Sequence, residues 1–220
     1  MQVAVRRRCA VCVLRRPASG QSPYCEHHSR LNDLSTHLAN TLQISPDAIT
    51  GRARKLRDAG LLSKGKQGRY AGATMTDSDG ANLLLASVVD PPYGADVAGT
   101  VARMRALPFT QLIGRDDFAD TLKFMRARTF GEALEALLGD LRSDAWRFLI
   151  QGGTYPLHIN CSIDTGNADV MIGLSRVRMI EGTAGWIYRD GPPHSATVFR
   201  HVYLRDDVFL NLAEALGPPP

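Results

Sequence analysis

Four side chains near the N-terminus have the types and the spacing of a metal site. Two residues separate Cys9 from Cys12, and two separate Cys25 from His28. Three thiolates and one imidazole form closed tetrahedral zinc sites, which leave no position for a water. We therefore predict a zinc ion with a structural role. His27 is an alternative fourth ligand, and three unconnected reduced cysteines are the competing interpretation.

Charge is divided unevenly along the chain. Residues 1–71 hold 13 Lys and Arg against 4 Asp and Glu, whereas residues 72–220 hold 13 against 18. This asymmetry indicates that the basic part meets a polyanion and that the remainder has another task. A chance excess of solvated arginines is the alternative.

A helix, a turn and a second helix follow the Cys-rich segment. Leucines at helical spacing predict an amphipathic first helix in LNDLSTHLANTLQ, residues 31–43. Ser45 is a good N-cap and Pro46 a good first residue for the second helix, which Gly60 would end. The buried stripe predicted for the second helix is Ile49, Ala53 and Leu56. Beyond it, LLS and YAGATM are expected to pair as two strands across the loop KGKQGR.

The opposite face of the second helix carries polar and small residues. They are Asp47, Thr50, Gly51, Arg54, Lys55 and Asp58. Glycine in the middle of a helix costs about 1 kcal/mol relative to alanine. Its presence is reasonable if the helix lies close against another surface.

Together, LSTHLANTLQIS, PDAITGRARKLRDAG and LLSKGKQGRYAGATM resemble the winged helix-turn-helix domain of bacterial transcription regulators. The resemblance implies that the second helix enters the major groove of double-stranded DNA. The hairpin, called the wing, would reach the backbone or the minor groove. Asp47, Thr50 and Arg54 would face bases, since arginine offers a bidentate fork to guanine. The side chains expected at phosphates are Lys55, Lys64, Lys66 and Arg69.

One feature departs from the family pattern. A further helix usually packs behind these two, and there is little room for it before residue 31. The segment DSDGANLLLASVV, residues 77–89, could supply that helix, or the Cys-rich segment could fill the gap. The alternatives to DNA binding are a solvated basic helical hairpin and a protein-docking module.

The Cys-rich segment, residues 1–30, has almost no apolar core, so metal would fold it. Its spacing resembles a zinc-ribbon or treble-clef knuckle. Such a knuckle would hold nearby arginines beside the winged helix and widen its DNA footprint. The arginines expected to act in this way are Arg6, Arg7, Arg8, Arg15 and Arg16.

The rest of the chain predicts an α+β fold. Helical stripes at residues 97–107 and 130–141 precede segments with a period of two, which indicate an antiparallel β-meander. A final helix would begin at Asp206 and end at Gly217. We therefore predict three parts: the Cys-rich segment, a winged helix at 31–89 and an α+β domain at 95–217.

No catalytic constellation is found. His158 and Cys161 would point to opposite faces of a strand and could not form a nucleophile–base pair. No apolar run is long enough to span a membrane, so we expect a cytoplasmic protein.

The expected function is a sequence-specific DNA-binding transcriptional regulator of a bacterium, phage or mobile element, acting as a homodimer. Its C-terminal domain would dimerise the protein or sense a small-molecule or protein effector. Strand faces with Trp186, Tyr188 and Tyr203 are a candidate dimer interface or pocket wall, and a plain core role is the alternative. An alternative function is a DNA packaging or replication adaptor that assembles through the C-terminal domain.

Overall fold

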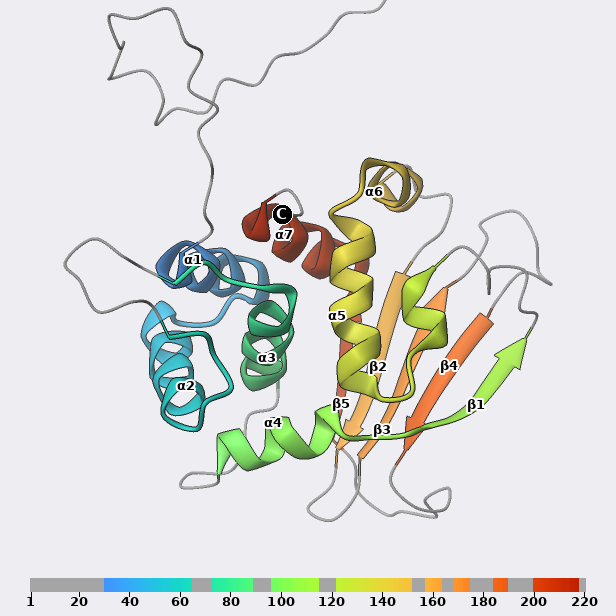
Figure 1. Ribbon diagram of the computed structural model, residues 1–220, viewed down its shortest axis with the longest axis horizontal. Helices are drawn as coiled ribbons and strands as arrows, with labels where there is room; N and C mark the ends of the chain where they lie inside the picture. The colour runs from blue at the N-terminus through green and yellow to red at the C-terminus, as the bar shows by residue number, and fades with distance from the viewer. Residues whose placement is uncertain are drawn as a thin grey trace, which may run out of the picture.

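A computed structural model describes residues 30–64, 73–88, 96–114, 122–151, 157–163, 168–174, 184–189 and 200–217. The described residues form an α+β fold in which helices lie over one face of an antiparallel sheet (Figure 1). The predicted fold class is confirmed at this level. None of the described helices is long and apolar enough to cross a membrane.

The helix α3, Asp77–Val88, lies at the centre of the helical part (Figure 1). Its neighbours are α1 (Leu31–Leu42), α2 (Pro46–Asp58), α4 (Val97–Arg105) and α5 (Phe130–Leu141). Every residue of α3 from Asp79 onward is buried. The run LLLASV gives α3 apolar or small side chains on all sides, as a helix enclosed by others requires. The segment predicted to complete the winged helix is therefore a helix and packs on both α1 and α2.

The C-terminal helix α7, Asp206–Leu216, packs back on α1 and α5. Arg142 fixes this arrangement, because its Nε donates to the Gly217 carbonyl and its Nη1 to the Asp77 carboxylate, each at 2.7 Å. The helix α6, Asp144–Gln151, contacts α5 and α7 and was not predicted. The domain boundary predicted between residues 89 and 95 lies outside the described residues. Buried residues before and after it belong to one hydrophobic core.

The described strands form one sheet in the order β1–β4–β3–β2–β5. Their bounds are β1 Phe109–Gly114, β2 Leu157–Ile163, β3 Ala168–Leu174, β4 Ala184–Arg189 and β5 Arg200–Arg205. The meander is confirmed for β2, β3 and β4, which are antiparallel neighbours. It is wrong for β5, which pairs with β2, because β1 occupies the place beside β4.

Alternation along the strands gives the sheet an inner and an outer face. The inner face packs against α5 and the 3-10 helix η2, Lys123–Arg126. The Phe124 and Trp186 rings meet edge to face with centroids 5.2 Å apart, and Tyr188 is fully buried, so the core role holds for both strand aromatics. Cys161 lies on this inner face, where burial raises the pKa of its thiol to about 12. His158 lies on the outer face, as predicted.

Candidate nucleic-acid interface

The residues predicted to face DNA from α2 lie together on its exposed side. Ile49, Ala53 and Leu56 are buried towards α1 and α3, as the stripe predicted. Because residues three and four apart share a helix face, the remaining positions point to solvent. Each residue of the predicted polar face is exposed: Asp47, Thr50, Gly51, Arg54, Lys55 and Asp58.

Local sequence sets both ends of α2. Pro46 is the first helical residue, where its missing amide hydrogen leaves no bond unmade. Ser45 occupies the N-cap position, as predicted, but its side chain makes no capping hydrogen bond. Gly60 has φ +75°, the left-handed conformation expected of a glycine after a helix. Lys55 and Arg57 lie in the last turn, where positive charge complements the helix dipole.

Two arginines of α2 have different positions. Arg52 is half-buried, and its Nη1 donates to the Ser87 carbonyl at 2.8 Å, which ties α2 to the C-terminal end of α3. Arg57 is exposed and was not among the predicted DNA-facing residues. Its spacing of three from Arg54 could have identified it, since both lie on one helix surface.

Gly51 and Thr50 shape the middle of the exposed face. A Cβ atom at Gly51 would meet nothing within 4 Å among the described residues, so packing within that part of the chain does not require glycine there. The Thr50 hydroxyl donates to the Pro46 carbonyl at 2.9 Å. Its lone pairs remain available to accept hydrogen bonds from a ligand. The centre of this face therefore has no protruding side chain at Gly51. The Thr50 hydroxyl can accept a hydrogen bond from a ligand there, because its own proton is donated to Pro46.

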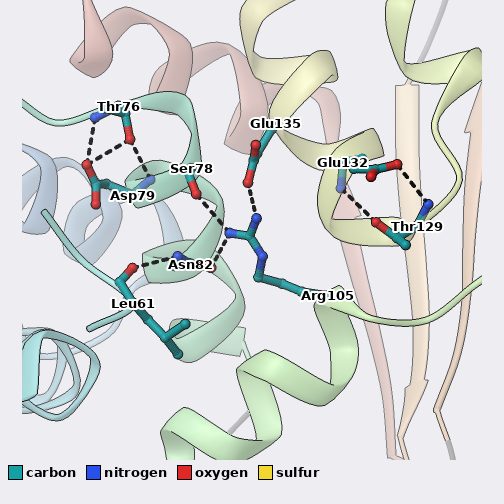
Figure 2. Close-up of polar contacts among 9 residues, drawn as sticks. All are labelled: Leu61, Thr76, Ser78, Asp79, Asn82, Arg105, Thr129, Glu132 and Glu135. Carbon is teal, nitrogen blue, oxygen red and sulfur yellow. Dashed lines mark hydrogen bonds and ion pairs between the residues drawn. The ribbon is translucent and has the colours of Figure 1, made fainter. Parts of the chain in front are cut away.

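The base of the predicted wing is held by one buried carboxylate. Asp79 is 2% exposed and accepts from the Ser63 amide at 2.7 Å and from the Ser63 hydroxyl at 2.8 Å. It also accepts from the amide and the hydroxyl of Thr76, each at 2.8 Å (Figure 2). We call Leu61–Lys64 and Ala73–Thr76 the wing stems. Asp79 joins them where they leave the helices.

The wing stems are not strands, so the predicted pairing of LLS with the end of YAGATM is wrong in the described residues. The amides of Ser63 and Thr76 donate to Asp79, and the Leu61 carbonyl accepts from the Asn82 side chain at 2.6 Å. These bonds replace cross-strand bonds. Part of the signal was in the sequence, because TDSD matches the capping-box spacing at Thr76 and Asp79.

A row of polar side chains leads from the wing stems to α5 (Figure 2). Asn82 donates to Leu61 and accepts from Arg105 Nη1 at 2.6 Å. Arg105 also donates to the Ser78 hydroxyl at 3.0 Å and pairs with Glu135 of α5. Gly131 makes room for this arginine, because a Cβ there would lie 2.9 Å from the Arg105 Cβ. The helix that carries the exposed basic face is thus fixed on a scaffold that includes α5.

Several predicted site residues lie outside the described residues. Lys64 is described and exposed at the end of the first wing stem. The predicted site residues outside the described residues are Lys66 and Arg69 of the wing, Arg6, Arg7 and Arg8, and the zinc ligands Cys9, Cys12, Cys25 and His28 with the alternative His27. The zinc ion and the wing contacts therefore stay predictions from spacing and charge.

Comparison with protein-family models, with curated proteins and with solved structures found no match for this chain. The function is therefore inferred from the chain's own residues.

Proposed function

We propose that the protein is a sequence-specific, double-stranded DNA-binding transcriptional regulator that presents α2 to the major groove. The observation that carries the proposal is the exposed face of α2, whose polar side chains pack against none of the other described elements. A helix with its side chains is about 10–12 Å across, and the major groove is about 12 Å wide, so α2 fits into the groove.

Each residue of that face has a role suited to its chemistry. Arg54 would donate a bidentate pair to guanine, and Asp47 would accept from cytosine N4. Gly51 would allow the helix backbone to approach the base edges closely. Lys55 and Lys64 would contact phosphates on either side, together with Lys66 and Arg69 of the wing. Arg57, exposed in the last turn of α2, joins this group.

The protein would act as a homodimer, because one helix reads only a few base pairs and two half-sites multiply specificity. A structural zinc ion at the Cys-rich segment would hold Arg6, Arg7 and Arg8 near the duplex. The helices α5 and α7 pack on the DNA-facing unit, so an effector bound by the C-terminal part would act through them.

The test is selection of bound duplexes from a randomised DNA pool at near-physiological salt. The proposal expects an enriched inverted repeat, whose spacing gives the separation of the half-sites. Binding without enrichment, together with an assembly larger than a dimer, would replace the regulator by a packaging or replication adaptor. No binding at all would make α2 a docking surface for protein.

A further inference from the structure

The outer face of the sheet carries no helix among the described residues, and several of its side chains are open to solvent. Tyr203 is 61% exposed and Ile113 is 48% exposed. Tyr203 is on the edge strand β5 and Ile113 on the opposite edge strand β1. The described side chains of this face are Gln111, Ile113, His158, Asn160, Met171, Ile187, Arg189, Tyr203 and Arg205.

Two rings are stacked at the β5 side of this face. The centroids of His158 and Tyr203 lie 5.5 Å apart, and the ring planes differ by 25°. The His158 ring lies directly over Gly173, where a Cβ atom would come within 2.2 Å of its Cε1 and Nε2 atoms. Burial lowers the pKa of His158, which favours its uncharged form. Glycine at 173 therefore permits a stacked pair of planar rings whose outer member is exposed.

The register places this pair in a row that crosses the sheet. Ile113 pairs with Gly185, which pairs with Gly173, and His158 lies between Gly173 and Arg205. Side chains of the sheet itself lie over both glycines, His158 over Gly173 and Met171 beside Gly185. The exposed Arg205 ends the row beside the ring pair.

Size and charge distinguish the possible occupants. Five strands about 4.8 Å apart and about 20 Å long give a face of roughly 400–500 Å². A standard protein interface buries roughly 800 Å² of accessible surface on each partner, which is more than the flat outline of this face. The described charged side chain that β5 brings to this face is Arg205, which is exposed. Both properties favour a small, flat, anionic occupant.

We propose that the outer face binds single-stranded nucleic acid, with bases stacked on the Tyr203–His158 pair and a phosphate at Arg205. Base–aromatic stacking tolerates any sequence because every base has a π-face. Antiparallel sheets with exposed aromatics stack two or three bases in this way. The site goes beyond the duplex-binding function proposed for α2 and lies on a different part of the molecule.

The experiment is titration of a fluorescently labelled 12-nucleotide oligo(dT) with the full chain, followed by anisotropy at two salt concentrations. Tyr203→Ala should weaken binding by about fivefold to a hundredfold, as loss of one stacked base does. Tyr203→Phe keeps the ring and should bind like the wild type. Gly173→Val should weaken binding as well, because its side chain displaces the His158 ring. Circular dichroism confirms that each variant is folded.

Arg54→Ala separates this site from the proposed duplex-binding function. Arg54→Ala should weaken duplex binding and leave oligo(dT) binding unchanged. Tyr203→Ala should weaken oligo(dT) binding and leave duplex binding unchanged. Unchanged oligo(dT) binding in Tyr203→Ala would overturn the proposal. A change in oligomer mass with no change in oligo(dT) binding would make the face an interface between copies instead.

Discussion

The helices α2 and α3 have similar lengths and contribute in opposite ways. In α3 every residue from Asp79 to Val88 is buried, and its polar side chains are hydrogen-bonded within the protein. In α2 only three residues are fully buried, and the opposite face has no described packing role. Selection for folding explains the sequence of α3. It does not explain an exposed mid-helix glycine beside arginine and lysine, which is why we assign the function to α2.

The largest expected effect is on α3. Leu84→Ala removes a fully buried side chain at the centre of the helical part and should lower the free energy of unfolding by about 2–5 kcal/mol. Chemical denaturation measures this change. Leu31→Ala, at a half-buried position of α1, is the matched control and should cost clearly less. Equal losses in the two variants would mean that α3 is not the centre of the core.

Asp79→Ala should lower the free energy of unfolding by about 1–3 kcal/mol, because the amides of Ser63 and Thr76 lose their buried acceptor. It should also weaken duplex binding at a temperature where the variant is folded, since the wing stems are no longer joined. Denaturation and duplex titration measure the two effects. Asp33→Ala, exposed on α1, serves as the control. Full stability of Asp79→Ala would show that the hydrogen bonds to Asp79 do not hold the wing stems.

Gly51→Ala should have effects of opposite sign on stability and on binding. Alanine should raise the free energy of unfolding by about 0.5–1 kcal/mol, since it favours the helix and meets no neighbour. The added methyl group should weaken duplex binding if α2 lies close to base edges. Denaturation and anisotropy on the same preparation test both. A more stable variant with unchanged affinity would remove Gly51 from the interface.

Lys66→Ala should have the smallest effect. Loss of one phosphate contact should weaken all duplexes alike and reduce the slope of log affinity against log salt by about one unit. The measurement is a salt series on a selected and a random duplex. The same slope for variant and wild type would place the wing away from the DNA.

The helices could be predicted where the sequence of the helix itself carries the signal. α1, α2, α5 and α7 each have an apolar stripe, and Pro46, Gly60 and Gly217 mark helix ends. The strand β1 was missed because its register shifts between Phe109 and Gln111, which breaks its alternation. The partner of β5 could not be predicted, since alternation fixes which residues face inward but not which strand is adjacent.

The candidate site shows the same division. Helical periodicity was sufficient to place Arg54 and Lys55 on the exposed side of α2. The bonds from Ser63 to Asp79 join residues 16 apart and depend on tertiary packing. Only the bond between Thr76 and Asp79, three residues apart, could be predicted from the sequence. The stack of His158 on Tyr203 depends on the pairing of β2 with β5, which the sequence did not determine.

The most direct test of the account compares Arg54→Ala with Arg128→Ala on the selected duplex and on a random duplex. Both arginines are exposed, and Arg128 lies outside α2. Arg54→Ala should lose about 1–3 kcal/mol of binding free energy on the selected site and much less on random DNA. Arg128→Ala should bind both duplexes like the wild type. Equal losses for Arg54→Ala on the two duplexes would contradict sequence reading by α2.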